Sequence, residues 1–282
     1  MTKMQYFLRS LEKYNDPSSW LCPNCGSAKG QECDRKYFLT RLIRCDVCRL
    51  MFRAPTDSEE FNEKFYNFFY KQGTGTEVPS EAGLARLVET NFTGSDRDYK
   101  RYIDMLKSQG IMPGAKVFDF GASWGYGSYQ LSRAGYEVRA YEIARDRRAY
   151  AIDKLGIGHI DKPFAIVKGH PLYNSFDCFL SVHVLEHVPA PSKVIDLAWN
   201  CLRPGGTFVA VTPNGSDAYR KCNSQSWRRM WGGVHPNFLD DVFYDAQFAR
   251  SRHLFVSLSG GGAFEEYEFG FVAFKDAQQV GF

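Results

Sequence analysis

The sequence predicts an α/β fold in which a doubly wound, mostly parallel sheet follows a small cysteine-rich module. From Lys116 onward, short apolar runs rich in Val, Phe and Tyr alternate with segments of helical period. Strands that alternate with helices pair in parallel through right-handed crossovers, which builds a doubly wound sheet. Two pairs of cysteines lie within residues 21–54, ahead of that pattern. The 282 residues are enough for one full α/β domain and one smaller module.

The segments before the sheet are predicted to be helical. Residues 1–20 have the pattern of a short amphipathic helix that ends at an Asn-Asp-Pro turn. Residues 57–73 begin with an Asp/Ser/Glu helix-start signal and carry aromatic residues at helical spacing. We interpret this aromatic run as core or domain interface. Residues 73–81, rich in Gly, Thr and Pro, are the predicted linker, and helices at 82–92 and 95–110 lead to the sheet.

The sheet is predicted from six apolar runs. The expected strands are 116–120, 136–143, 176–184, 206–213, 253–259 and 269–275, with helices at 126–135, 145–156 and 192–202. A loop-rich stretch follows Pro213. The predicted domains are residues 1–56 for the N-terminal helix and cysteine module, 57–109 for a helical linker or lid region, and 110–282 for the α/β domain, which includes a substrate-side insertion at 214–240.

Composition and charge exclude several classes of protein. The chain is 44% hydrophobic and 24% charged, which is typical of a globular protein without a long disordered tail. A net charge of +3 is too small to identify a partner. A pI of about 8.3 and interspersed acids and bases do not support a nucleic-acid partner, but they do not exclude one. No segment approaches the roughly 18 apolar residues of a membrane span, and the N-terminus lacks the apolar run of a signal peptide. We therefore expect a soluble cytoplasmic protein without a membrane partner.

Two Cys-x-x-Cys pairs indicate a metal site. Cys22 and Cys25 form the first pair, and Cys45 and Cys48 form the second. Each pair places two thiolates on one side of a tight turn, and four thiolates make the tetrahedral site that zinc prefers. A closed four-sulfur site leaves no position for a substrate, so we expect a structural zinc ion. A redox dithiol is the alternative, which suits one pair better than two; Cys33 is interpreted as a bystander.

A glycine-rich turn follows the first expected sheet strand, in VFDFGASWGYGS at residues 117–128. The backbone N–H groups of such a turn cradle the polar part of a nucleotide-like ligand. A phosphate loop needs Gly-Lys-Ser/Thr, and a dinucleotide fingerprint needs a glycine where Gln130 stands. Asp119 precedes the first glycine, and Glu142 ends the next strand, where a carboxylate accepts both hydroxyls of a ribose. We expect an adenosine ligand; the alternative is a tight turn that binds nothing.

With these segments the chain resembles the class I S-adenosylmethionine-dependent methyltransferases over roughly residues 116–213. The matching segments are VFDFGASWG, VRAYEI, FDCFLSVHVLEHV and CLRPGGTFVAVTPN. The resemblance implies a Rossmann-like, seven-stranded sheet and S-adenosylmethionine as the cofactor. The cofactor-binding residues that it implies are Asp119, Gly121, Ala122, Ser123, Gly125, Glu142, Ile143 and Ser181.

The resemblance also implies roles within this set. Three residues shape the methionine pocket: Asp119, Gly121 and Gly125. Glu142 holds the ribose, and Ile143 packs on the adenine. Ser123 stands where the family has its middle glycine, so either the turn tolerates a serine or its backbone lies further from the cofactor. Asp161 is the only candidate for an acid that binds the adenine.

The cysteine module, from about Leu21 to Tyr70, resembles the zinc ribbon that precedes bacterial methyltransferase domains, several of which modify sugars. The resemblance implies a small polar acceptor, namely a sugar, a nucleotide-linked sugar or a glycan end, and favours O-methylation over C-methylation. Tyr66 or Tyr70 is a candidate to line a sugar pocket, and Arg228 and Arg229 are candidates to bind a phosphate of the acceptor. An RNA methyltransferase and a binding module without activity are the rival interpretations. The oligomeric state does not follow from the sequence.

Four residues are candidates for the chemistry. In HVLEH, His183, Glu186 and His187 have the i, i+3, i+4 spacing that shares one face of a helix, and His235 lies in the insertion. In one interpretation, His235 or His183 is the general base that removes a proton from the acceptor hydroxyl. In another, all four bind a divalent ion that orients and acidifies two hydroxyls, as a similar set does in the plant small-RNA 2′-O-methyltransferases. In a third, Glu186 and His187 only bond the backbone.

Overall fold

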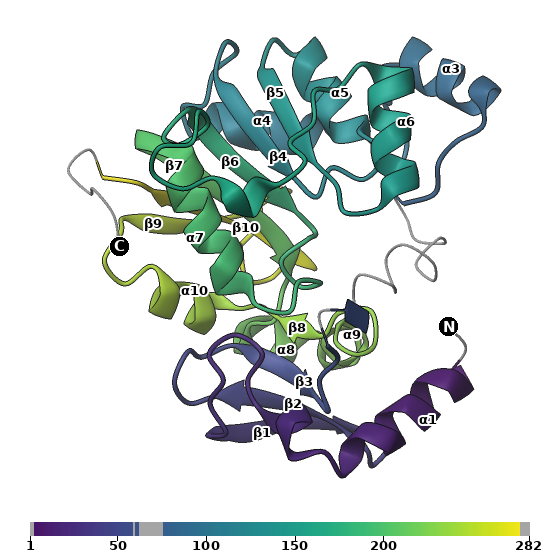
Figure 1. Cartoon of the computed structure of the whole chain (residues 1–282), viewed down its shortest axis with the longest axis vertical. Coiled ribbons are helices and arrows are strands. Elements are labelled where there is room, and N and C mark those ends of the chain that lie inside the picture. Colours follow the sequence, from purple (N-terminus) through teal and green to yellow (C-terminus); the bar gives the residue numbers. More distant parts are fainter. Residues whose placement is uncertain (1–2, 59, 62–75, 277–282) are drawn as a thin grey trace. The chain divides into compact units, whose positions relative to one another are not determined.

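The computed structural model describes residues 3–58, 60–61 and 76–276 (Figure 1). Most of the predicted helix at 57–73, including Tyr66 and Tyr70, lies outside these residues. The chain packs as two compact units. The first unit comprises Met1–Asn62, His183–Asp196 and Ala210–Ala273, and the second comprises Glu63–Val182, Leu197–Val209 and Phe274–Phe282. Each unit combines segments that are distant in the sequence, so the limits at 56 and 109 stay a prediction.

A mostly parallel sheet carries the fold. Its strands are β4 (Lys116–Phe120), β5 (Glu137–Tyr141), β6 (Phe176–Val182), β7 (Leu202–Pro213), β9 (His253–Val256) and β10 (Glu268–Phe274). Their order is β5-β4-β6-β7-β10-β9. Strand β4 pairs in parallel with β5 and β6, and β10 pairs antiparallel with β9. The predicted Rossmann-like α/β class is confirmed, with six strands among the described residues, as in the six apolar runs, where the family resemblance implied seven.

An isolated bridge occupies the sheet edge beside β5. His159 forms a single parallel bridge with Ala140. The Ala140 N–H donates to the Gly158 carbonyl at 2.8 Å, and the Ile160 N–H donates to the Ala140 carbonyl at 2.9 Å. The next residues turn into the short 3₁₀ helix Pro163–Ala165. The Glu142 N–H, which would continue the ladder, donates instead to His159 Nε2 at 2.9 Å, so the pairing at this edge ends after one bridge.

The helices predicted between the strands are confirmed, with limits that differ by one or two residues. They are α5 (Tyr126–Arg133), α6 (Arg145–Leu155) and α7 (Pro191–Cys201), preceded by α3 (Glu81–Glu89) and α4 (Lys100–Ser108). Helix α6 ends at Gly156, which adopts a left-handed φ of 66° and so allows the chain to turn away. The core of the second unit is aromatic: the ring of Phe179 on β6 lies 5.0 Å from Phe118 and 5.5 Å from Phe120 on β4.

Lys275 closes the carboxyl end of α7 from a buried position. Its side-chain nitrogen donates to the carbonyls of Trp199 and Leu202 at 2.6 and 2.7 Å and to Asn174 Oδ1 at 2.8 Å. Carbonyls at a helix end lack partners within the helix. We expect Lys275→Met to lower the free energy of unfolding by about 2–3 kcal/mol, measured by urea denaturation. Exposed Lys168→Met is the control, and equal stability of the two variants would contradict this role.

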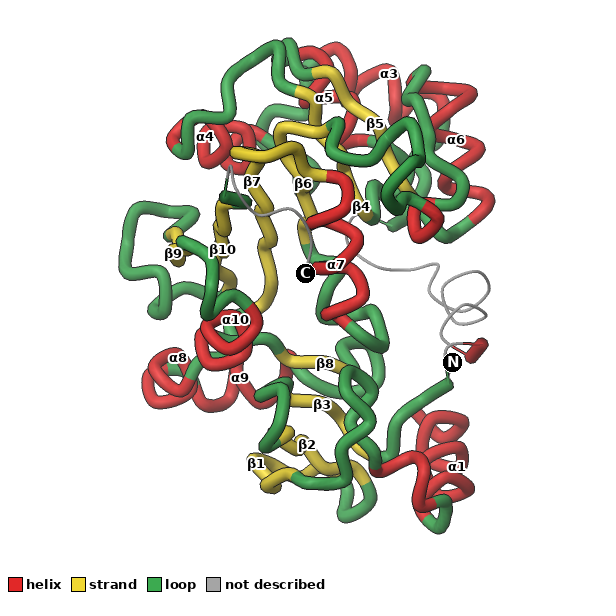
Figure 2. The backbone as a smooth tube through the Cα atoms, turned by 60° about the vertical axis from the view of Figure 1, so that its left-hand side comes forward, coloured by secondary structure: helices red, strands yellow, loops and turns green. Residues whose placement is uncertain are grey.

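The cysteine module forms a second, antiparallel sheet. It contains β1 (Gly30–Lys36), β2 (Thr40–Cys45), β3 (Met51–Ala54) and β8 (Asn237–Phe238), in that order. Figure 2 shows these strands side by side. Strand β8 comes from the predicted insertion, which also supplies α8 (Asp217–Cys222) and α9 (Ser224–Met230). One buried cluster joins them: Leu42, Met51, Tyr219, Trp227, Met230, Trp231 and Phe238. The ribbon and the insertion therefore share a core.

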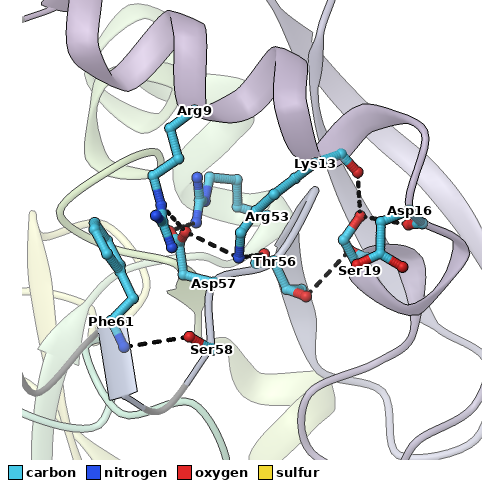
Figure 3. A network of polar contacts seen from close by, with 9 residues as sticks. All are labelled: Arg9, Lys13, Asp16, Ser19, Arg53, Thr56, Asp57, Ser58 and Phe61. Carbon is cyan, nitrogen blue, oxygen red and sulfur yellow. Dashed lines mark hydrogen bonds and ion pairs between the residues drawn. The ribbon is translucent and has the colours of Figure 1, made fainter.

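Asp57 gathers three cations at the start of the first unit (Figure 3). Helix α1 (Lys3–Tyr14) supplies Arg9, whose Nε donates to Asp57 Oδ1 at 2.7 Å, and Lys13, whose Nζ lies 3.4 Å from the same oxygen. Arg53 of β3 contacts Oδ2. Burial raises the pKa of Asp57, but the three cations outweigh burial and hold this pKa below 3.8. The carboxylate thus ties α1 to the end of β3.

Asp57→Asn leaves the three cations without their shared carboxylate. We expect a loss of about 3–5 kcal/mol in the free energy of unfolding, measured by urea denaturation at pH 7, with exposed Glu12→Gln as the control on α1. Because the pKa of Asp57 is depressed, its contribution is present above pH 3.8 and is lost as the pH falls through the folded value. The difference between wild type and variant should therefore shrink in acid, and a constant difference would contradict the assignment.

A short helix, α10 (Asp241–Gln247), precedes β9 and begins at the side-chain cap of Asp240. A 3₁₀ helix, Pro17–Trp20, follows α1.

Among the described residues, no helix has the length and apolar character that crossing a membrane requires.

Candidate active site and metal centres

The turn between β4 and α5 is organised by Glu142. The N–H groups of Gly121 and Ala122 donate to the Tyr141 carbonyl at 2.8 and 2.9 Å, and the Ser123 N–H donates to Glu142 Oε2 at 2.9 Å. Ser123 has a left-handed φ of 50°, which costs an L-residue about 1–2 kcal/mol. The bond to the carboxylate offsets that cost. The turn therefore accommodates serine in the glycine's place.

The other side of the turn is packed tightly. Gly125 has a φ of 87°, and a Cβ there would lie 2.8 Å from the Cβ of Ala151 on α6, so only glycine fits. Trp124 is fully buried, with its ring 5.1 Å from Tyr126 and 6.1 Å from Phe92. Trp124 therefore anchors the turn in the core of the second unit.

Two buried carboxylates flank the turn. Asp119 is 2% exposed, and its Oδ2 accepts the Ser128 hydroxyl at 2.6 Å. Burial raises the pKa of Asp119 to about 6; Glu142 adds to this rise, and the Ser128 bond opposes it. Glu142 Oε1 accepts the Ala144 N–H at 2.8 Å and Arg147 Nη2 at 2.9 Å. These bonds fix both carboxylates before any ligand binds.

Three further cofactor candidates also lie in the second unit. Ile143 follows Glu142 and is 40% exposed, which leaves an apolar surface beside the turn. Ser181, one residue before the end of β6, is fully buried, and its hydroxyl has no hydrogen-bond partner among the described residues. Asp161 has an 82% exposed side chain, 3.5 Å from His159 Nδ1. The first two fit a flat, polar ligand at the end of the parallel strands, whereas Asp161 faces solvent.

The four paired cysteines converge in the first unit. Cys22 Sγ lies 3.5 Å from Cys48 Sγ, Cys25 Sγ lies 3.5 Å from Cys45 Sγ, and all four sulfurs are within 4.8 Å of one another. Tetrahedral zinc with bonds of about 2.3 Å separates its sulfur ligands by a little under 4 Å. The cluster therefore fits a zinc ion, and its four thiols leave no open position. Cys33 lies outside it, packed against the ribbon core.

The two cysteine pairs share one backbone geometry. In the first, the Gly26 N–H donates to the Cys22 carbonyl at 2.8 Å, and Gly26 has a φ of 74°. In the second, the Arg49 N–H donates to the Cys45 carbonyl at 3.1 Å, and Arg49 has a φ of 65°. Each turn thus closes at a left-handed residue four positions after its first cysteine, so both present their thiols in the same way.

Glu186, His187 and His235 form a second cluster in the first unit. Glu186 is 1% exposed, and neither of its carboxylate oxygens accepts a hydrogen bond from a described residue. His187 Nδ1 donates to the Val234 carbonyl at 2.8 Å, and His235 Nδ1 donates to the Met230 carbonyl at 2.5 Å. A carbonyl only accepts, so in each neutral ring Nε2 carries the lone pair. One ligand atom from each residue lies within 4.8 Å of the others.

Burial sets the charges in this cluster. It lowers the pKa of His187 to about 4, against the attraction of Glu186, so His187 is neutral at neutral pH. It opposes ionisation of Glu186, but the neighbouring histidines outweigh it and lower the pKa of Glu186 to about 2. A buried carboxylate beside a neutral imidazole is a donor set that suits a divalent cation. The segment that carries Glu186 and His187 is a turn, not the helix considered in the sequence analysis.

His183 has a different environment. Its Nε2 lies 2.5 Å from Glu268 Oε2, and its Nδ1 lies 3.4 Å from Glu186 Oε1. Burial lowers the pKa of His183, but the two carboxylates together raise it more, to about 10. At neutral pH this imidazole is therefore a cation, which neither accepts a proton nor binds a metal ion. The geometry thus favours neither role considered for His183 in the sequence analysis.

The profile of a family described as "Methyltransferase domain" matches residues 82–255. The chain belongs to this family. A ubiquinone biosynthesis O-methyltransferase of Psychrobacter cryohalolentis is 25% identical over 218 residues, which are 70% of this chain and 82% of that relative. One of Xanthomonas campestris is 27% identical over 124 residues, 41% of this chain and 50% of its own. A solved SAM-dependent methyltransferase from Aquifex aeolicus aligns with 61% of this chain and 87% of its own, at 18% identity and a TM-score of 0.45.

The family membership makes this chain an S-adenosylmethionine-dependent methyltransferase. In this methyltransferase, Asp119 is a buried carboxylate beside the glycine-rich turn that follows β4. The pKa of Asp119 is raised, so ionisation costs stability, and that cost accumulates between pH 3.8 and 6. At pH 8 we expect Asp119→Asn to raise the melting temperature of the ligand-free enzyme and to weaken S-adenosylmethionine binding about tenfold or more. Calorimetry measures both the melting temperature and the affinity for S-adenosylmethionine. Unchanged binding would show that Asp119 does not contribute to the cofactor pocket.

Two arginines of α9 were candidates for a phosphate site. Arg228 Nη2 donates to the Arg35 carbonyl at 2.6 Å, and its Nε lies 3.6 Å from Asp34 Oδ2. Arg228 is thus used in packing α9 against β1. Arg229 is exposed on the same helix.

Two residues of the methyltransferase that the sequence analysis did not consider lie at the second cluster or next to it. Glu268 of β10 ion-pairs with His183, which in turn lies 3.4 Å from Glu186. Asn237 of β8 is fully buried, and its N–H donates to the Glu186 carbonyl at 3.1 Å. The only sequence signal for Glu268 is an acid at the start of an apolar strand, and Asn237 follows a proline in a loop-rich stretch. Neither pattern is specific.

Proposed function

We propose that this methyltransferase transfers its methyl group to a hydroxyl of a small polar acceptor with two neighbouring hydroxyls, such as a sugar, a nucleotide-linked sugar or a glycan end. The observation that carries the proposal is the buried Glu186 carboxylate, which ion-pairs with His183 and has one ligand atom within 4.8 Å of one each from His187 and His235. The Psychrobacter and Xanthomonas relatives are both O-methyltransferases by name, which supports transfer to oxygen.

In this proposal, Glu186, His187 and His235 hold a divalent cation. Two imidazoles and one carboxylate suit such an ion and leave coordination positions open for acceptor oxygens. The carbonyls of Val234 and Met230 fix the ring orientation of the two histidines. When bound, the cation supplies a positive charge that acidifies an acceptor hydroxyl. His235 then acts as a ligand and not as a general base, and His183 is left out of the ligand set.

The residues of this chain divide the remaining work. Methyl transfer is an in-line displacement: the bond from carbon to the sulfonium sulfur breaks as the bond to the acceptor oxygen forms, and the hydroxyl proton leaves. Asp119 and Glu142 hold the turn between β4 and α5, which is proposed to bind the methyl donor. The proposed contacts to the cofactor are made by Gly121, Ala122, Ser123, Gly125, Ile143 and Ser181. Protonated His183 bridges Glu186 and Glu268 and keeps Glu186 ionised.

The four-cysteine cluster is proposed to hold a structural zinc ion. A small antiparallel sheet buries too little apolar surface to be stable alone, and metal binding supplies the missing free energy. The matched backbone turns at Cys22 and Cys45 prearrange the four thiols for this ion.

An acceptor panel tests the proposed reaction. The enzyme is given S-adenosylmethionine with a labelled methyl group and, separately, nucleotide-linked sugars, free sugars, glycan ends, catechols and transfer RNA. Mass spectrometry then locates the label. Label on one of two neighbouring hydroxyl oxygens supports the proposal, and the sugar and catechol arms decide the acceptor class. Label on nitrogen or carbon, or on RNA alone, would overturn it.

A further inference from the structure

We infer that Asn237 is a positioning residue for the cluster of Glu186, His187 and His235, and that the four-cysteine ribbon holds this cluster together through it. The inference deepens the proposed function and rests on it for the role of the cluster. The residues that Asn237 contacts, and those that hold it in place, all belong to the first unit.

Asn237 joins the turn that carries Glu186 and His187. Its backbone N–H donates to the Glu186 carbonyl at 3.1 Å, and its side-chain Nδ2 donates to the carbonyls of Val188 and, at 3.5 Å, Pro189. The side chain is fully buried. Two carbonyls accept from the Asn237 side-chain nitrogen, and this fixes the orientation of the amide. If the amide were flipped, its oxygen would face the two carbonyl oxygens and could not donate a hydrogen bond to either.

The same short segment carries the other ligand. His235 lies two residues before Asn237, and the carbonyl of Val234 accepts Nδ1 of His187. Three hydrogen bonds therefore join residues 234–237 to residues 186–188: Val234 with His187, Asn237 with Glu186, and Asn237 with Val188. These bonds keep one ligand atom from each of Glu186, His187 and His235 within 4.8 Å of the others.

The ribbon holds this segment from its other side. Strand β8 pairs with β3, where Asn237 faces Phe52 and Phe238 faces Met51. The Arg53 N–H donates to the Pro236 carbonyl at 2.7 Å. Strand β3 begins three residues after Cys48, the last thiol of the cysteine cluster. The path from the cysteine cluster to the ligand segment is thus one short strand.

Further contacts make the ribbon and the segment one body. Trp231 Nε1 donates to Asp34 Oδ2 of β1 at 3.0 Å, and Arg44 of β2 ion-pairs with Asp240 at 2.5 Å. Asn24, inside the first cysteine pair, accepts the Ser192 N–H at 2.9 Å, a few residues beyond His187. The cofactor candidates Asp119 and Glu142 belong to the second unit. Loss of the ribbon should therefore remove the ligand cluster without removing the cofactor turn.

The test compares Asn237→Ala and Asn237→Asp with Asn214→Ala in the full-length protein. Asn214 is the matched control: it is equally buried, and its Nδ2 also donates to a backbone carbonyl, that of Glu266, at 2.9 Å. Three properties are measured. They are the melting temperature, the affinity for Mn²⁺ by electron paramagnetic resonance, and the nitrogen resonances of the imidazoles.

We expect both Asn237 variants to bind Mn²⁺ at least tenfold more weakly and to lose the Nδ1-protonated signature of His187, with S-adenosylmethionine affinity unchanged. Asn214→Ala should lose a similar amount of stability and neither property. If wild type binds no Mn²⁺, the proposed ion fails, and the imidazole resonances alone decide the positioning role. Resonances and affinity that respond alike in the Asn237 and Asn214 variants would overturn the inference.

Discussion

Glu186→Gln is expected to lower turnover by about two to four orders of magnitude while the affinity for S-adenosylmethionine stays within about twofold. The substitution keeps the shape of a side chain that is 1% exposed and removes its negative charge. In the proposed reaction this charge balances both the divalent cation and protonated His183. Turnover is measured as S-adenosylhomocysteine formed with the accepted substrate, and calorimetry gives the cofactor affinity.

His235→Ala should fall in the same range, because it removes one imidazole of the same set. Two further substitutions serve as controls for Glu186→Gln and His235→Ala. Glu265→Gln changes an exposed acid in the same unit, and His253→Ala removes an imidazole that pairs with Asp245. Neither should alter turnover more than about threefold, as is usual for surface positions. Wild-type turnover in Glu186→Gln would show that the carboxylate has no part in the reaction.

Cys45→Ser is expected to abolish zinc binding and to unfold the ribbon. Structural zinc in small modules contributes on the order of 10 kcal/mol at neutral pH, which is more than a small sheet gains from its own core. Cys45 is fully buried and begins the second cysteine turn. Zinc content by atomic absorption should fall from one ion per chain to none, and the variant should lose part of its β-sheet circular dichroism.

Cys33→Ser is the matched control for this prediction. Cys33 is a cysteine of the same hairpin, but it lies outside the four-sulfur cluster. The Cys33→Ser variant should keep one zinc ion, and its free energy of unfolding should fall by about 1 kcal/mol at most. Equal zinc content in the two variants would show that the four thiols do not hold the ion.

Local patterns in the sequence predicted most of the fold. The alternation of apolar runs and amphipathic segments identified the strands and helices of the parallel sheet, because both periods are set by residues close in the chain. The turn with Gly121 and Gly125 and the two cysteine pairs are likewise short-range patterns. Their spacing is sufficient to place the two glycines at left-handed positions of one turn and the four thiols together, and the structure contains both arrangements.

Long-range contacts were beyond such patterns. The protonation of His183 depends on Glu268 of β10, the strand next to the edge strand β9. No local spacing connects Glu268 to HVLEH. The pairing of β8 with β3 joins a two-residue strand to the ribbon, and two residues are too few to show a period. For the same reason, the shared core around Trp227 and Trp231 was read as a loop-rich insertion. The exchange of glycine for Ser123 became understandable only with its bond to Glu142.

The most direct test of the proposed reaction measures methyl transfer before and after weakly bound divalent ions are removed, with the ribbon zinc retained and quantified. Dialysis against a chelator that leaves one zinc ion per chain prepares the sample. We expect turnover to fall at least about 100-fold and to return when Mn²⁺ is added, in wild type but not in Glu186→Gln. Turnover that stays at the wild-type level after this treatment, with no response to Mn²⁺, would contradict the proposed role of Glu186, His187 and His235.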